Sequence, residues 1–179
     1  MSNFHDLIVR RHSIRRYTDE PISADDVTTI LQAALMAPSS KRTMPWEFLL
    51  IEDKEKLQEL SKCREMGTLP LANCSLAIFV MANPEITDAW IEDASIAAAY
   101  LQLQAEDLGL GSCWVQIRNR YTADGESAQD FISGIVSLPP EQMILCAITL
   151  GHKAEERKPF DLEKLKWEKV HIAQWRTDE

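Results

Sequence analysis

The stretch at residues 76–81, Leu-Ala-Ile-Phe-Val-Met, constrains the fold most, because it is apolar at every position. A continuous apolar run without polar alternation is typical of a strand that is buried on both faces. Residues 113–117 and 144–150 are two further apolar runs that predict core strands, and residues 48–52 predict a short strand. These runs predict that a β-sheet lies at the core of the fold.

Helical patterns alternate with these strands. The predicted helices cover residues 3–11, 23–37, 53–64, 88–108 and 126–136. The helix at 88–108 is the longest, and small residues at positions 94, 95 and 97–99 make its middle narrow, which permits close approach of another backbone. We interpret it as a central core helix, or as one that packs against its symmetry mate in a dimer. The alternation of elements favours an α/β or an α+β fold without deciding between them.

Length and charge limit the class of protein. A chain of 179 residues is long enough for one domain with a substantial core. The formal net charge of -9 argues against a nucleic-acid partner. No apolar run reaches about 18 residues and the N-terminus has no apolar signal core, so we expect no membrane span. The cysteines show no metal-ligand spacing, so we expect no metal site and reduced, buried thiols in a cytoplasmic protein. They are Cys63, Cys74, Cys113 and Cys146.

Residues 8–17 are basic within this acidic chain. Four of the 19 Lys and Arg residues fall there, on either side of His12 and Ser13. Guanidinium groups, an imidazole and a hydroxyl at the end of a helix are good donors to a phosphate. The alternative interpretation is that Arg10 and Arg11 only complement the dipole at the C-terminus of the first helix and are solvated.

Familiar catalytic motifs are missing from the sequence. It contains no Gly-x-Ser-x-Gly, no His-Glu-x-x-His and no phosphate-binding Gly-x-x-x-x-Gly-Lys. Residues 109–111, Gly-Leu-Gly, precede a strand instead of following one, which is the wrong context for a dinucleotide phosphate loop. A phosphate-binding patch without a nucleophile or a metal indicates that a phosphorylated cofactor carries the chemistry.

The residues 10–17, Arg-Arg-His-Ser-Ile-Arg-Arg-Tyr, resemble the N-terminal signature of the nitroreductase family of FMN flavoproteins. Four further stretches resemble this family in the same order. They are residues 37–40 with Pro45 and Trp46, the alanine-rich helix that leads into residues 109–114, residues 150–152 with 154–156, and residues 168–171. Together these stretches span nearly the whole chain.

This resemblance implies an α+β fold, with a central mixed β-sheet flanked by helices, in an intertwined homodimer that holds two FMN molecules at its interface. It implies an FMN-dependent oxidoreductase that uses NADH or NADPH to reduce small acceptors, such as nitroaromatics or quinones, by a ping-pong hydride mechanism. We expect residues 1–179 to form one flavin-binding domain, with residues 151–179 as a tail on the partner subunit. An FMN-binding dimer without turnover, acting as a carrier or sensor, is the alternative.

The resemblance also implies which residues contact the flavin, and no protein group is expected to act as a catalytic acid or base. Those expected at the ribityl phosphate are Arg11, His12, Ser13 and a late basic residue, Lys164 or one of Arg157, Lys158 and Lys166. Those expected along the ring are Arg15, Pro38, Ser39, Ser40, Arg42, Trp114, Val115 and Gln116, the Pro-Ser-Ser loop coming from the partner subunit. Arg15 cannot be deprotonated, so it would raise the flavin potential. Arg42 stands where the family often has Asn, and it either adds charge at the ring or points to solvent.

Overall fold

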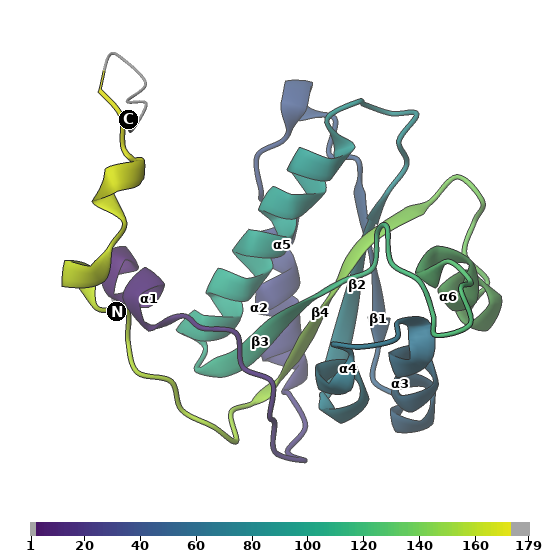
Figure 1. Cartoon of the computed structure of the whole chain (residues 1–179), viewed down its shortest axis with the longest axis horizontal. Coiled ribbons are helices and arrows are strands. Elements are labelled where there is room, and N and C mark those ends of the chain that lie inside the picture. Colours follow the sequence, from purple (N-terminus) through teal and green to yellow (C-terminus); the bar gives the residue numbers. More distant parts are fainter. Residues whose placement is uncertain (1–2, 173–179) are drawn as a thin grey trace.

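A four-stranded sheet forms the centre of the molecule in the computed structural model, which describes residues 3–172 (Figure 1). The strands are β1 (Trp46–Ile51), β2 (Leu76–Ala82), β3 (Leu110–Gln116) and β4 (Met143–His152). They lie in the order β1-β2-β4-β3, so β2 and β4 are central and β3 is an edge strand. Every residue of β2 is buried, which confirms that the apolar run is a strand covered on both faces.

Six α-helices and four short 3₁₀ turns surround the sheet within the described residues. The helices are α1 (Phe4–Arg10), α2 (Ala24–Leu35), α3 (Lys54–Leu60), α4 (Leu69–Asn73), α5 (Trp90–Asp107) and α6 (Ala128–Val136). The 3₁₀ turns are η1 (Ser40–Arg42), η2 (Ser61–Cys63), η3 (Leu162–Lys164) and η4 (Trp167–Lys169). Side chains at Asn3, Ser23, Asp53 and Ser127 accept backbone N–H groups at the starts of α1, α2, α3 and α6, which fixes where those helices begin.

Helices cover both faces of the sheet. The side chains of Ile78 and Val80 face a cluster with α2 and α5, whereas those of Ala77 and Phe79 face a second cluster with α3 and α6 (Figure 1). This arrangement is α+β, as the resemblance implies. It differs from the implied mixed sheet in one respect, because all three strand pairings are antiparallel. The parallel pairing seen in the described residues is confined to a single bridge between Ser13 and Ser112.

Helix α5 is a core helix. Ala94, Ala97 and Ala98 are fully buried, and α2 packs along the helix, so the narrow middle serves close packing within one chain. On its outer side Ile96 and Tyr100 remain exposed. In the part of the chain that the structure describes, neither this helix nor any other has the length and apolar character that a membrane crossing requires.

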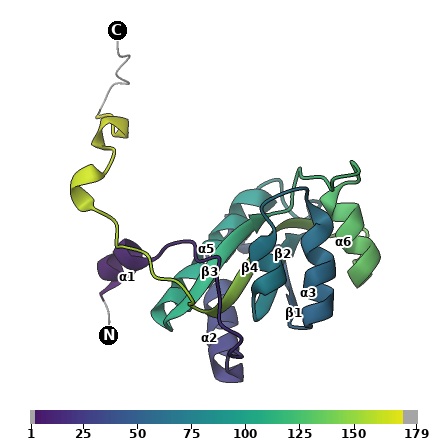
Figure 2. The ribbon, with the colours of Figure 1, turned by 60° about the horizontal axis from the view of Figure 1, so that its bottom comes forward.

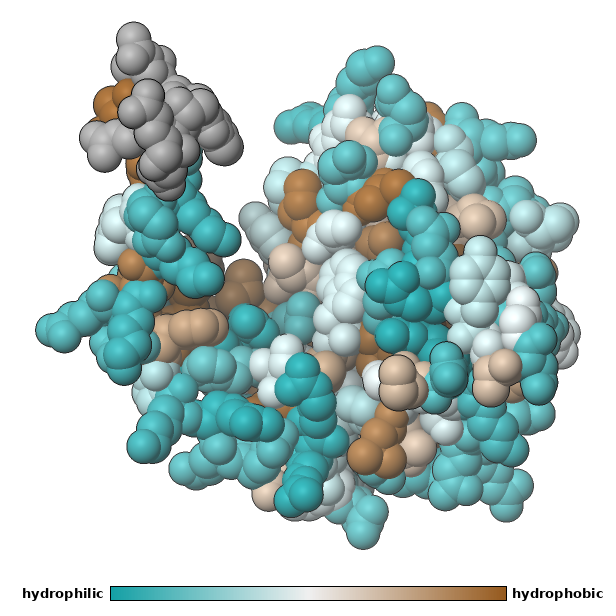
Figure 3. Space-filling model, viewed as in Figure 1, coloured by the Kyte–Doolittle hydropathy of each residue, from teal (hydrophilic) through white to brown (hydrophobic). Residues whose placement is uncertain are grey.

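The two ends of the chain form an arm beside the sheet. Residues 153–172 leave β4 and run past α1, where the N–H of Phe160 donates to the carbonyl of Val9 over 2.9 Å (Figures 1 and 2). In the space-filling view the upper part of the arm stands apart from the body (Figure 3). Its apolar side chains are exposed, namely Phe160, Leu162, Leu165, Trp167, Val170 and Ile172. The last part of the predicted tail, residues 173–179, lies outside the described residues.

The four cysteines are free and buried, as expected. Burial raises the pKa of Cys63 to about 11 and that of Cys74 to about 12. Thiols with such pKa values are protonated at neutral pH and are therefore poor nucleophiles.

Candidate functional site

The basic segment at residues 11–17 lies extended against the edge of the sheet. The N–H of Ile14 donates to the carbonyl of Ser112 over 2.9 Å. A Cβ atom at Gly111 would lie 2.8 Å from Cγ2 of Ile14, and one at Gly151 would lie 2.9 Å from Cβ of Tyr17. Two glycines in the family-like stretches are therefore needed because the segment approaches the strands too closely for a side chain.

Tyr17 anchors the C-terminal end of this segment. Its hydroxyl lies 2.7 Å from the carbonyl oxygen of Ile14 and 2.7 Å from the hydroxyl of Thr149. Burial raises the pKa of Tyr17 above its ordinary value, so the phenol stays neutral and keeps a proton to donate. The N–H of Arg15 donates to Oε1 of Glu155 over 2.9 Å, and this bond lowers the pKa of Glu155. The arm and the strands thus hold the segment at several points.

Successive side chains of the segment point to opposite sides, as in any extended chain. Arg11, Ser13 and Arg15 share one side, above Cys113 of β3. Burial raises the pKa of Cys113, while the charge of Arg15, a hydrogen bond with Ser13 and the charge of Arg11 act in the opposite direction. Among the described residues neither Arg11 nor Arg15 forms an ion pair, so both charges face this site without a carboxylate partner.

His12 points to the other side of the segment. Its ring stacks on Phe160, with centroids 4.4 Å apart and 22° between the planes. Its Nε2 atom is buried and has no hydrogen-bond partner in the described part of the chain. His12 also lines a pocket of about 290 Å³ together with Arg10 and Arg157. The predicted phosphate residues are therefore adjacent in sequence, but their side chains point to opposite sides of the extended segment.

The late basic residues differ in where they lie. Lys164, the first candidate, sits on the arm in η3, where its Nζ lies 2.9 Å from Oδ2 of Asp161 and its side chain is 83% exposed. Arg157 lines the same pocket as His12 and pairs with Glu155 at 3.3 Å. Of the four candidates, Arg157 is the one that the described contacts bring to the basic segment. Lys158 and Lys166 are exposed.

The predicted Pro38, Ser39 and Ser40 loop lies near the start of α5, at the other end of the molecule. The N–H of Ser40 donates to Oδ1 of Asp93 over 2.8 Å, and Asp93 is buried. Its Oδ2 has no hydrogen-bond partner in the described residues. Lys41, Arg42 and Met44 adopt positive φ angles of 50°, 57° and 45°, which side chains disfavour. The surrounding bonds hold this loop in one shape, and Arg42 is exposed on it.

The loop and the basic segment do not meet within one chain. Asp93, which holds the loop, and Glu106, which pairs with Lys153 beside the basic segment at 2.8 Å, lie on the same helix. At 1.5 Å of rise per residue they are separated by about 20 Å. The structure therefore brings together Arg11, Ser13 and Arg15 but leaves Pro38, Ser39 and Ser40 apart from them.

The predicted ring segment forms part of edge strand β3. Nε1 of Trp114 donates to Oε1 of Gln116 over 2.9 Å, and Nε2 of Gln116 donates to the carbonyl of Arg118 over 3.0 Å. These bonds fix both half-buried side chains on one side of the strand, whereas Val115 is buried in the core on the other. Val115 can present only its backbone to a ligand on the Trp114 side.

Arg64 was not predicted and lies at this segment. Its Nη1 donates to the carbonyl of Gln116 over 3.0 Å. Burial, followed by the charge of Arg120, lowers the pKa of Arg64. No motif in the sequence marks this residue, because its contact crosses 52 positions of the chain. Arg11 and Arg15 lie near Cys113, three positions earlier on the same strand.

The sequence model of the nitroreductase family matches residues 8–69 and 68–152. The chain belongs to the nitroreductase family. Five separate stretches of the sequence resembled this family, and the match confirms that resemblance. The solved structure of an FMN-dependent nitroreductase from Clostridium difficile is similar to this chain with a TM-score of 0.92 and 45% sequence identity, covering 94% of this chain and 98% of that one.

Two curated relatives add to this comparison. A protein from Archaeoglobus fulgidus, whose name pairs NADH dehydrogenase with NAD(P)H nitroreductase, is 30% identical over 174 residues, which covers 94% of this chain and 97% of the relative. An FMN reductase (NADPH) from Bacillus subtilis is 25% identical over 177 residues, covering 86% of this chain and 67% of the relative. Family membership therefore extends over almost the whole chain.

Proposed function

We propose that this nitroreductase-family chain is an FMN-dependent oxidoreductase that uses NADH or NADPH to reduce small acceptors such as nitroaromatics or quinones. The observation that carries the proposal is the convergence of Arg11, Ser13 and Arg15 on one side of β3, with no carboxylate partner for either guanidinium in the described residues. The similar Clostridium difficile structure is named as FMN-dependent, and the Bacillus subtilis relative as an FMN reductase.

The donor set at the basic segment fits a flavin mononucleotide. A phosphate monoester carries about two negative charges and accepts several charge-assisted hydrogen bonds. Arg11 and Ser13 would hold the phosphate, whereas His12 lies on the other side of the segment, stacked on Phe160. Trp114 and Gln116, whose side chains lie on the other face of β3 from Cys113, would meet the ring at the edge of this strand. The residues present therefore fit the cofactor.

The chain's own residues would position and tune this cofactor. Bound FMN would supply the two-electron chemistry, taking a hydride from the nicotinamide and passing it to the acceptor. The guanidinium of Arg15, near the pyrimidine edge, would favour the negative charge of the reduced ring. Glu155 holds the backbone of Arg15 in place through the 2.9 Å bond. No protein acid or base is assigned, so protons would come from water.

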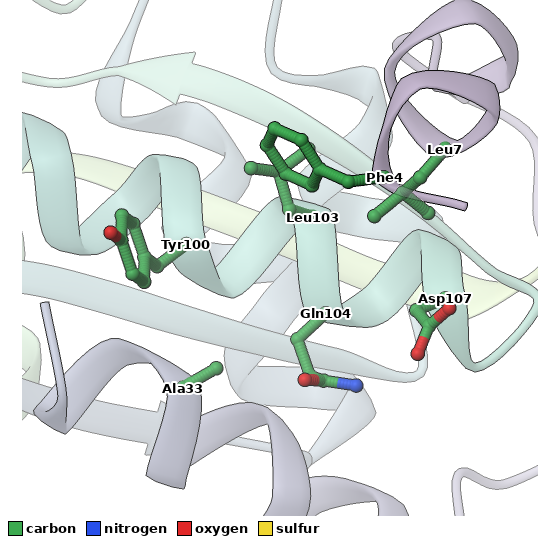
Figure 4. Close-up of a pocket in the computed structure, with 7 residues that line it drawn as sticks. All are labelled: Phe4, Leu7, Ala33, Tyr100, Leu103, Gln104 and Asp107. Atoms are coloured by element: carbon green, nitrogen blue, oxygen red, sulfur yellow. The ribbon is translucent and has the colours of Figure 1, made fainter. Parts of the chain in front are cut away.

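The active unit that we propose is a homodimer in which the Pro38, Ser39 and Ser40 loop of one subunit reaches the flavin of the other. Asp93, which holds the loop, and Glu106, which lies beside the basic segment, are about 20 Å apart along α5. One chain would therefore supply two separate halves of a site. A cavity of about 370 Å³ between α1, α2 and α5 is lined by seven residues, and Figure 4 shows their side chains, among them Phe4 and Tyr100, around it. This face would lie against the second subunit.

The arm would cover part of the same partner. Its apolar residues, from Phe160 to Ile172, are exposed in one chain and would become buried on a second copy. In this arrangement residues 1–179 act as one domain, with residues 151–179 as a tail on the partner. The free, buried thiols suit the reducing conditions of the cytoplasm, where we place the protein.

The proposal is tested by loading the purified protein with FMN and adding NADH or NADPH without oxygen. Absorbance of the oxidised flavin at roughly 450 nm should bleach and return when a quinone is added. Binding of FMN without bleaching by either nicotinamide would favour a carrier or sensor. Failure to bind FMN would overturn the proposal altogether. In the Arg15→Ala variant the flavin potential should fall more than the affinity does, and an unchanged potential would remove that role.

A further inference from the structure

A second polar pocket lies just beyond the proposed ring segment. After β3 the chain makes a tight turn, in which the N–H of Arg120 donates to the carbonyl of Ile117 over 3.1 Å and Asn119 adopts a φ of 57°. This turn places Arg118, Asn119 and Arg120 on the wall of a pocket of about 490 Å³. Trp90, at the start of α5, lines the same pocket.

The wall of this pocket is cationic in an acidic chain. The guanidinium carbon of Arg118 lies 5.8 Å from the centre of the Trp90 ring, and Nη1 of Arg120 donates to the carbonyl of Asn119 over 2.8 Å. Neither guanidinium forms an ion pair in the described structure. The one acidic residue on the wall is Asp130, whose Oδ2 accepts from the hydroxyl of Ser127 over 2.7 Å. Two fixed guanidinium groups against one carboxylate favour an anionic ligand.

Two aromatic side chains line the pocket beside these charges, of which Trp90 is buried and Tyr121 is exposed. Trp90 already holds a guanidinium over its ring, and Tyr121 lines the pocket with 60% of its surface exposed. Aromatic and guanidinium planes both stack on nucleobases, and guanidinium groups bind phosphate oxygens in pairs. A nucleotide carries a phosphate next to a flat base. The guanidinium groups of the pocket wall suit the phosphate, and its aromatic ring suits the base.

We propose that this pocket binds the adenosine 2′-phosphate of NADPH, and that the enzyme therefore prefers NADPH to NADH. The inference rests on the proposed function, which places the nicotinamide over the flavin ring along Trp114 and Gln116. Arg120 follows Gln116 by four positions, which is at most about 14 Å of chain, and the nicotinamide and the adenosine form the two ends of the dinucleotide. The two nicotinamide donors differ by that one phosphate, so guanidinium groups that bind it select between them.

Calorimetric titration of the FMN-loaded protein with adenosine 2′,5′-bisphosphate and with adenosine 5′-monophosphate tests the site without turnover. The bisphosphate should bind at least tenfold more tightly, the effect expected of a charge-assisted hydrogen bond. The double variant Arg118→Gln, Arg120→Gln should lose this difference, whereas Lys56→Gln, an exposed change on α3, should keep it. Equal binding of the two ligands by the unaltered protein, or an unchanged ratio in the double variant, would overturn the inference.

Two further measurements keep the outcome clear. The exposed Arg120 is also changed alone, so that a failure of the double variant to fold leaves the single variant to decide, with a smaller loss of the bisphosphate preference expected. The ratio of kcat/KM for NADPH to that for NADH should fall roughly tenfold to hundredfold in the double variant. Equal use of NADH and NADPH by the unaltered enzyme overturns this inference while leaving the flavin function intact. Discrimination between the two nucleotides without any flavin bleaching overturns the function instead.

Discussion

The two ends of α5 differ in what they hold. At its C-terminal end the basic segment lies on β3 with Arg11 and Arg15 unpaired in the described structure, fixed by backbone bonds and by the close approach to Gly111. At its N-terminal end the loop at Ser39 and Ser40 is held by a hydrogen bond from the N–H of Ser40 to buried Asp93, and Lys41, Arg42 and Met44 beside it adopt positive φ angles. One end supplies charge and the other supplies a rigid shape.

This difference supports the proposal that two chains complete one site. A flavin needs donors for its phosphate and a shaped wall for its ring, and about 20 Å of helix separates the two in a single chain. A second copy that brings its loop to the basic segment would unite them, as the proposed homodimer does. Each end can therefore be altered alone, and its effect compared with that of the other.

Arg11→Ala should have the largest effect, at the charged end. Loss of a charge-assisted bond to the phosphate should weaken FMN binding by about 1.5–3 kcal/mol. Fluorescence titration of the flavin measures it, with Arg16→Ala, an exposed neighbour, as the matched control. Equal affinity in the Arg11 variant and in the control would show that the phosphate lies elsewhere.

Asp93→Ala tests the rigid end. Without the carboxylate the N–H of Ser40 loses its acceptor, and the unfolding free energy should fall by about 1–3 kcal/mol. Glu92→Ala, one position away on the exposed side of α5, should cost much less. Chemical denaturation measures both, and similar losses would mean that the loop does not depend on Asp93.

Tyr17→Phe tests how firmly the basic segment is anchored. Removal of the hydroxyl eliminates the 2.7 Å contacts to Ile14 and Thr149 and should cost about 0.5–1.5 kcal/mol of unfolding free energy. Tyr121→Phe, with an exposed ring, is the control and should have little effect. Thermal unfolding of the two variants compares them directly, and an unchanged Tyr17 variant would contradict the anchoring.

Glu155→Gln should have the smallest effect, and it should depend on pH. The folded pKa of Glu155 lies below the unfolded one, so its contribution to stability is present above the unfolded pKa and is lost as pH falls through the folded pKa. The unaltered protein should therefore lose more stability than the Gln variant on acidification below about pH 4.5. Parallel pH profiles for the two proteins would argue against this contact.

Much of the fold could be predicted from local patterns. Apolar runs located all four strands and helical spacing located α2, α5 and α6, because burial of a repeated face dominates such segments. Helix α4 was missed because its five residues, one of them a proline, are too few to show a helical spacing of apolar residues. The antiparallel sheet was not evident either, because a run that is buried on both faces is compatible with either direction.

The site could be predicted in part, and only through the family resemblance. The basic segment was identified, but its division into two sides, with His12 against Phe160, follows from an extended backbone that sequence spacing did not reveal. Arg64 and Arg157 acquire their places through contacts between distant parts of the chain, as with the 3.0 Å bond from Arg64 to Gln116. Contacts between residues that are distant in the sequence cannot be predicted from sequence spacing.

Mixing two defective subunits tests the shared site most directly. One subunit carries Arg11→Ala with Arg15→Ala, and the other carries Ser40→Trp, which would block the loop; each alone should bind FMN poorly. If the halves come from different subunits, the mixed dimer contains one site with both normal halves, and up to half of the sites should regain full FMN affinity. If every site is built within one chain, each keeps a defect, and no affinity returns on mixing.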